Sequence, residues 1–262
     1  MSAIFIDDGI VHYEAIGRGQ PIIFLHSWIG SWRYWVTTMQ IAASRYRSYA
    51  LDLWGFGDSD KHPGKYTLEN QISLLGDFIQ HMGLHDVTLI GHGLGALVVS
   101  FYAADHPEIV KRTMLISFPL ENDPLHRRLS YLSVEEAVTW LLGRHPDQEI
   151  SRQEALKTDR RAIKLLLHQA LLVNRRQLAL RMPVLTLWIF NSDDPISRPP
   201  TPNTLNILPE LSGQVVFPES DHFPMLREAN RFCRLLSEFM ETEPDRKPSH
   251  LTLKREWRRR LR

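Results

Sequence analysis

The sequence predicts an α/β protein with a mostly parallel central sheet, flanking helices and one helical insertion. Short runs of strand character alternate with amphipathic helical stretches along most of the chain. Several of these runs are continuously apolar, which is typical of strands covered by helices on both faces. The alternation stops between residues 121 and 182, where helical patterns follow one another without an intervening strand.

The N-terminal residues predict a β-hairpin. Residues 4–6 and 10–13 have strand character, and the Asp8-Gly9 pair between them favours a tight turn. Further strands are expected at residues 21–25, 47–51, 87–90, 113–116, 184–190 and 214–217.

Apolar residues at helical spacing predict the helices between these strands. One stripe has a spacing of three or four and consists of Leu68, Ile72, Leu75, Ile79 and Met82. Thr67 is a suitable N-cap for this helix, and Gly83 is a suitable stop. Two more helices are expected at residues 95–104 and 228–240.

Residues 121–182 are predicted to form an inserted helical lid. Ser133 and Glu136 have the spacing of a capping box, and residues 162–180 form one long amphipathic stretch. The chain is thereby divided into an α/β core of residues 1–120 and 183–245, the lid, and a basic tail of residues 246–262.

The composition is that of an ordinary globular protein. Of the 262 residues, 43% are hydrophobic and 23% are charged, which is enough apolar sequence to bury a core. Cys233 is the only cysteine, so a disulfide within one chain and a cysteine-based zinc site are excluded. No apolar run approaches the roughly 20 residues of a membrane span, and the N-terminus lacks the basic region of a secretory signal. We expect a cytoplasmic protein.

The tail and the rest of the chain have charges of opposite sign. Residues 246–262 contain eight Lys or Arg and one acid, a net charge of +7, which leaves −6 for residues 1–245. Leu253, Trp257 and Leu261 recur every four residues among these basic side chains. This pattern predicts a basic amphipathic helix that lies on an anionic membrane surface, and the alternative is a solvated tail. Nucleic-acid binding is not expected, because the core has no basic bias.

A glycine-rich turn in mid-chain, LIGHGLGA at residues 89–96, fits two motifs. As Gly-x-Gly-x-x-Ala it fits a dinucleotide-binding fingerprint. As Gly-x-nucleophile-x-Gly it fits the nucleophile elbow of an α/β-hydrolase, with position 93 as the nucleophile. A dinucleotide site is expected at the first strand–helix turn, with an acid about 20 residues later. Here the turn lies in mid-chain and Glu121 is about 30 residues away, so a nucleotide-binding oxidoreductase is a remote alternative.

Four further segments, in the family's order, make the chain resemble the lid-bearing esterase and epoxide-hydrolase branch of the α/β-hydrolase superfamily. They are LHSWIGSW at 25–32, DLWGFGDSD at 52–60, NSDDPI at 191–196 and SDHFP at 220–224. The first is similar to the family's His-Gly loop after the third strand, but Ser27 replaces the usual glycine. The resemblance covers about residues 10–240. It implies an α/β-hydrolase fold and hydrolysis of esters, thioesters or similar bonds.

The resemblance also implies the site residues. The acid is Asp194, with Asp193 as the alternative, and the histidine is His222. The nucleophile position holds Gly93, which has no hydroxyl, so an acyl-enzyme cannot form there. The backbone N–H groups of Trp28 and Leu94 are the implied oxyanion donors. His26, Ser27, His92 and Trp140 are expected at the site of a small or medium, partly hydrophobic substrate. No metal or cofactor is expected.

Three interpretations of Gly93 stay open. In the first, His222, oriented by Asp194, acts as a general base on a water molecule in place of the missing hydroxyl. In the second, the protein is a pseudoenzyme whose pocket binds a ligand or partner without catalysis. In the third, glycine was introduced in place of the serine of an active parent enzyme.

Overall fold

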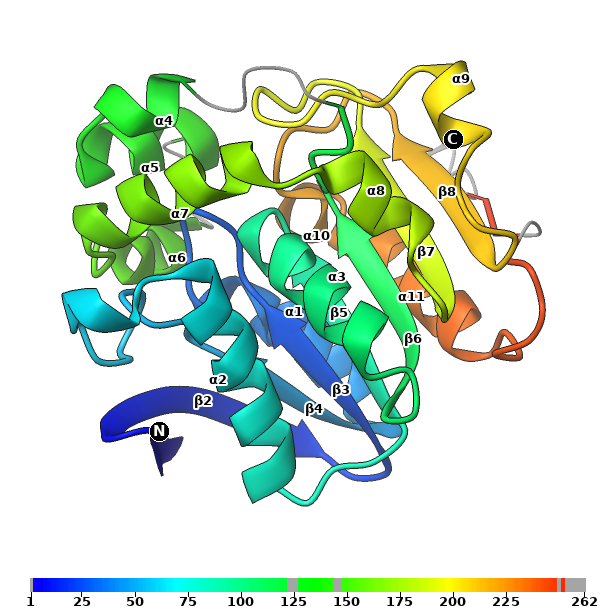
Figure 1. Cartoon of the computed structure of the whole chain (residues 1–262), viewed down its shortest axis with the longest axis horizontal. Helices are drawn as coiled ribbons and strands as arrows, with labels where there is room; N and C mark the ends of the chain where they lie inside the picture. Colours follow the sequence, from blue (N-terminus) through cyan, green and yellow to red (C-terminus); the bar gives the residue numbers. More distant parts are fainter. Residues whose placement is uncertain (1, 122–126, 144–147, 249–250, 253–262) are drawn as a thin grey trace, which may run out of the picture.

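A computed structural model describes residues 2–121, 127–143, 148–248 and 251–252. Eight strands form one sheet in the order β1-β2-β4-β3-β5-β6-β7-β8 (Figure 1). The strands are β1 (Ser2–Ile6), β2 (Gly9–Gly17), β3 (Gln20–Leu25), β4 (Tyr46–Leu51), β5 (Val87–His92), β6 (Val110–Ile116), β7 (Leu185–Asn191) and β8 (Ser212–Phe217). Strand β2 is antiparallel to β1 and β4, and the pairings from β4 to β8 are parallel. The predicted fold class is confirmed.

Helices cover both faces of the sheet. On the first face lie α2 (Leu68–His81), α3 (Leu94–Asp105) and α8 (Arg175–Leu180), and on the second lie α1 (Val36–Ala42) and α11 (Ala229–Met240) (Figure 1). The remaining helices are η1 (Trp32–Trp35), η2 (Pro63–Lys65), α4 (Arg127–Tyr131), α5 (Val134–Leu142), α6 (Glu149–Ala155), α7 (Arg160–Leu172), α9 (Pro202–Leu205) and α10 (Pro224–Arg227). The sequence reasoning did not predict α1.

The predicted caps of α2 are confirmed. Thr67 Oγ1 accepts a hydrogen bond from the Asn70 N–H at 3.2 Å. Gly83, just after the helix, has a φ of +61°, a conformation that costs glycine little.

The N-terminal hairpin forms, but its turn lies one residue earlier than predicted. Ile6 pairs with Gly9, so the two turn residues are Asp7 and Asp8, with φ values of +43° and +56°. Two-residue hairpin turns favour positive φ at both positions, and aspartate tolerates it better than most residues. Gly9 therefore starts β2 instead of ending the turn.

The helical insertion contains α4–α8, of which α4–α7 lie together at one side of the molecule (Figure 1). The predicted capping box is present: Ser133 Oγ accepts from the Glu136 N–H and Glu136 Oε2 accepts from the Ser133 N–H. The prediction of one helix over residues 162–180 is wrong. Val173 is extended and the side chain of Asn174 caps α8, so the stretch forms two helices.

Residues 253–262 lie outside the described residues, so the predicted amphipathic tail helix stays a prediction. Within the described ranges, no helix is both long enough and apolar enough to cross a bilayer.

Candidate active site

The sheet topology brings four loops to one edge. The strands β3, β5, β7 and β8 run parallel, so the loops that follow them meet at their carboxyl ends. These loops carry Ser27, Gly93, Asp194 and His222 in that order. The structure thus places residues nearly 200 positions apart in the sequence beside each other.

Gly93 occupies a sharp turn between β5 and α3. Its φ of +52° and ψ of −105° are strained for a residue with a side chain. The flanking glycines are needed for close packing, because a Cβ on Gly91 would overlap Ala96 and the Gly95 carbonyl, and one on Gly95 would overlap the Leu25 carbonyl of β3. The turn has this tight geometry although Gly93 has no side chain. The turn follows β5. A dinucleotide-binding turn would follow the first parallel strand, so the position of this turn does not fit that motif.

His222 and Asp194 form a buried, hydrogen-bonded pair. His222 Nδ1 lies 3.0 Å from Asp194 Oδ1 and 2.9 Å from Oδ2, and both side chains are fully buried. A carboxylate only accepts, so Nδ1 carries a proton, and in the neutral form of the ring Nε2 presents a lone pair. The neighbouring Asp193 is exposed and is not the partner of His222.

Backbone and side-chain donors hold the Asp194 carboxylate. Oδ1 accepts from the N–H groups of Ile196 at 2.8 Å and Ser197 at 3.1 Å, and Oδ2 accepts from Ser117 Oγ at 2.6 Å. Burial alone would raise the pKa of Asp194. The charge of His222, with the hydrogen bonds from His222, Ser117 and Ile196, outweighs burial and lowers this pKa to about 2.

The Ser27 side chain contacts His222 at the ring nitrogen that does not face Asp194. Its Oγ lies 2.8 Å from His222 Nε2, and in the neutral form of the ring the hydroxyl donates to Nε2. A Cβ added to Gly93 would overlap this Oγ, so the Ser27 hydroxyl fills the space in which a side chain at position 93 would begin. Ser27 and His222 are both fully buried.

The Ser27 backbone is held on both sides. Its N–H donates to Tyr34 Oη at 2.8 Å, and its carbonyl accepts from His26 Nδ1 at 2.8 Å. Tyr34 Oη in turn lies 2.9 Å from His92 Nδ1, and the Leu53 N–H donates to His26 Nε2 at 3.0 Å. Ser27 is therefore fixed relative to the elbow.

Burial keeps the two supporting histidines neutral. Burial, and after it the charge of His222, lowers the pKa of His92 well below its ordinary value. Burial also lowers the pKa of His26, although the charge of Asp52 and the hydrogen bond to the Ser27 backbone oppose it. The rings of His92 and His222 pack with centroids 4.3 Å apart. Both supporting histidines thus serve as fixed hydrogen-bonding groups.

The remaining predicted residues are Trp28, Leu94 and Trp140. Trp28 and Leu94 are fully buried and follow Ser27 and Gly93 directly in the chain. Trp140 lies on α5 of the insertion, where Arg128 covers its ring at 4.6 Å from the centroid.

Sequence reasoning missed Tyr34 and Ser117. Ser117 directly follows β6 at the same carboxyl edge of the sheet, and that position is a signal which could have found it. Tyr34 lies among tryptophans that indicate packing, and no sequence signal marks its hydroxyl.

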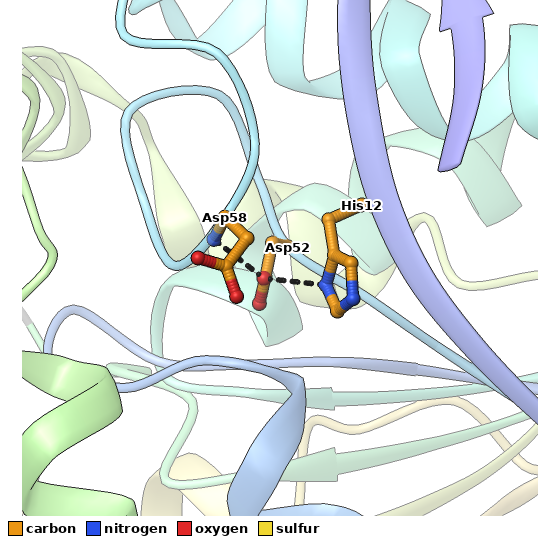
Figure 2. A group of neighbouring side chains, drawn as sticks. All are labelled: His12, Asp52 and Asp58. Carbon is orange, nitrogen blue, oxygen red and sulfur yellow. Dashed lines mark hydrogen bonds and ion pairs between the residues drawn. The ribbon is translucent and has the colours of Figure 1, made fainter. Parts of the chain in front are cut away.

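A second polar cluster consists of His12, Asp52 and Asp58 (Figure 2). Their potential ligand atoms lie within 4.8 Å of one another. Asp52 Oδ2 is 3.0 Å from His12 Nδ1 and accepts from the Asp58 N–H at 2.9 Å, while Oδ1 accepts from the Trp32 N–H at 2.8 Å. The Asp58 carboxylate pairs with Lys157 at 2.8 Å. These bonds account for the cluster as a support that orders the loop after β4.

The cluster also raises the pKa of His12. Burial lowers the pKa of His12, but the hydrogen bond to Asp52 and the charge of Asp52 outweigh it, and the net pKa is raised.

Comparison with known proteins gives concordant results. Residues 20–140 match the family described as the alpha/beta hydrolase fold. The chain is 30% identical to the soluble epoxide hydrolase of Corynebacterium sp. (strain C12) over 106 residues, which are 40% of this chain and 37% of that protein. It is 24% identical to the 2-hydroxy-6-oxo-6-(2'-aminophenyl)hexa-2,4-dienoic acid hydrolase of Metapseudomonas resinovorans over 92% of this chain and 91% of that protein.

Solved structures agree in fold. The esterase EaEST from Exiguobacterium antarcticum superposes with a TM-score of 0.77 at 20% identity, covering 92% of this chain and 99% of the esterase.

Proposed function

We propose that this chain, whose residues 20–140 match the alpha/beta hydrolase fold family, hydrolyses ester-type bonds with His222 as general base and Asp194 as the group that orients it. The observation that carries the proposal is the buried His222–Asp194 pair with Nε2 directed at a hydroxyl. Relatives whose names are those of hydrolases support the reaction class.

The energetics of the pair favour catalysis over binding alone. A buried carboxylate is costly unless it is paired and hydrogen-bonded, and an apolar pair of similar volume is often no less stable. Here three donors besides His222 hold the Asp194 carboxylate so that it fixes the tautomer of one histidine. An oriented imidazole whose lone pair faces a hydroxyl is what general-base catalysis needs.

The ester class rests on the surroundings of the pair. The backbone N–H groups of Trp28 and Leu94 are the proposed oxyanion donors. These residues directly follow Ser27 and Gly93, the two positions that lie against each other beside His222. The insertion, residues 121–182, is the proposed lid, with Trp140 among its substrate contacts. We expect a small or medium, partly hydrophobic substrate.

The basic tail, residues 246–262, is a proposed contact with anionic membranes.

A panel of short- and medium-chain p-nitrophenyl esters tests the proposal. The full chain is expected to hydrolyse at least one ester, and His222→Gln is expected to lower kcat by about 10³-fold or more. His85→Gln, at an exposed histidine between α2 and β5, is the matched control and should leave kcat unchanged. Undiminished activity in His222→Gln would overturn the proposal. A panel without turnover would favour the binding protein that the missing side chain of Gly93 suggests.

A further inference from the structure

We infer that Ser27 is the nucleophile of this hydrolase, so that the catalytic hydroxyl comes from the loop after β3 and not from the elbow. The inference rests on the proposed function, because it names the group on which the His222–Asp194 pair acts. Ser27 Oγ, His222 and Asp194 form one continuous hydrogen-bonded chain of 2.8 Å and 2.9 Å. A nucleophile, its base and an orienting carboxylate are linked in this way in acyl-transfer enzymes.

The residues at positions 27 and 93 depend on each other. In the loop pattern that this chain resembles, position 27 is glycine and position 93 carries the nucleophile. Here serine and glycine are exchanged. A Cβ on Gly93 would overlap Ser27 Oγ, so both positions cannot carry a side chain in this geometry. The exchange therefore keeps one hydroxyl in front of His222 and changes only the loop that supplies it.

The Ser27 hydroxyl is held in position beside its general base, His222. Tyr34 and His26 fix the Ser27 N–H and carbonyl. In the part of the chain that the structure describes, His222 Nε2 is the one hydrogen-bond partner of Ser27 Oγ. A hydroxyl that donates to a neutral imidazole can lose its proton to that ring as it attacks.

The reaction balances with water as the only co-reactant. Ser27 Oγ bonds to the ester carbonyl carbon and passes its proton to His222 Nε2, while the carbonyl electrons move onto oxygen. Collapse breaks the bond to the alkoxy oxygen, which leaves as the alcohol with the proton from His222. Water then attacks the acyl carbon and gives a proton to His222. The second collapse releases the carboxylic acid and returns that proton to Ser27 Oγ.

Labelling with a fluorophosphonate, followed by peptide mass mapping, tests the inference without depending on the preferred ester. We expect one phosphonyl adduct on Ser27, absent from Ser27→Ala and from His222→Gln. Ser31→Ala is the matched control, since this buried hydroxyl of the same loop caps η1 and is expected to leave labelling unchanged. Absence of an adduct on Ser27, or an adduct on another serine, would overturn the inference.

Ester kinetics separate this inference from the proposed function. Ser27→Ala is expected to lower kcat by about 10³-fold or more, with its fold checked by circular dichroism. The double variant Ser27→Gly/Gly93→Ser restores a hydroxyl at the elbow and is expected to recover at least about 100-fold over Ser27→Gly. If His222→Gln is inactive while Ser27→Ala keeps full activity, Ser27 is not the nucleophile and the His222–Asp194 pair acts on water. If His222→Gln is active, the proposed function itself fails.

Discussion

The overlap between positions 27 and 93 makes a quantitative prediction about stability. Gly93→Ser places a side chain at a φ of +52°, which costs about 1–3 kcal/mol in backbone strain. The new Cβ also overlaps Ser27 Oγ, and overpacking of a buried site costs about 1–3 kcal/mol more. In a Ser27→Gly background the overlap with Ser27 is gone, while the backbone strain and a 3.3 Å approach to Trp28 Cδ1 remain. The two substitutions are therefore expected to couple by about 1–3 kcal/mol, in the direction that makes the double variant more stable than additivity predicts.

Urea unfolding of the four proteins, followed by circular dichroism, measures this coupling. The free energies of unfolding of the original chain, Ser27→Gly, Gly93→Ser and the double variant close a thermodynamic cycle. At about 2–4 °C per kcal/mol, the same coupling appears as a difference in Tm. Additive effects within about 0.5 kcal/mol would refute the argument that Ser27 Oγ occupies the space beside Gly93.

Three further predictions concern the acid stability of the fold, the support of Ser27 and the basic tail. The pKa of Asp194 is lowered from 3.8 to about 2, so its interactions stabilise the fold fully above pH 4 and are lost as the pH falls toward 2; Asp194→Asn should flatten this part of the stability profile in acid titrations of unfolding. Tyr34→Phe leaves the Ser27 N–H and His92 Nδ1 without their common partner and should destabilise the fold by about 1–3 kcal/mol in urea unfolding, with a lower kcat and a similar KM. The full chain should sediment with anionic vesicles, while a chain that ends at Thr252 should stay in the supernatant.

A specific result would contradict each of these three predictions. An acid profile of Asp194→Asn that keeps the original slope would show that other groups govern it. Tyr131→Phe, on an exposed ring, is the control for Tyr34→Phe, and equal effects of the two would remove Tyr34 from the positioning of Ser27. Equal sedimentation of both chain lengths would exclude residues 253–262 as the membrane contact.

The fold and part of the site follow from local sequence patterns. The alternation of strands and helices predicts the parallel sheet. The resemblance of the loops at 191–196 and 220–224 to those of a known family implies Asp194 and His222, and the structure pairs these two residues. These predictions succeed because each depends on a short segment and on where its strand ends. The turn of the N-terminal hairpin and the break after α7 depend on single backbone conformations, which periodicity does not specify.

The contact between Ser27 and His222 does not follow from local patterns. The two residues are 195 positions apart, and Ser27 is recognisable in the sequence only as an unexpected serine in a glycine position. The role of Ser27 depends on the absence of a side chain at Gly93, which lies on a third loop. Tyr34 and Ser117 were missed for the same reason, because each acts on a residue brought to it by the tertiary fold.

Mass mapping of the chain during ester hydrolysis shows whether Ser27 becomes acylated. The full chain is mixed with a p-nitrophenyl ester, quenched in acid within milliseconds, and digested for peptide mass mapping. The account predicts an acyl group on the peptide that contains Ser27, at a level that rises with the initial burst of p-nitrophenol. Steady turnover with an unmodified Ser27 peptide and no burst would contradict it.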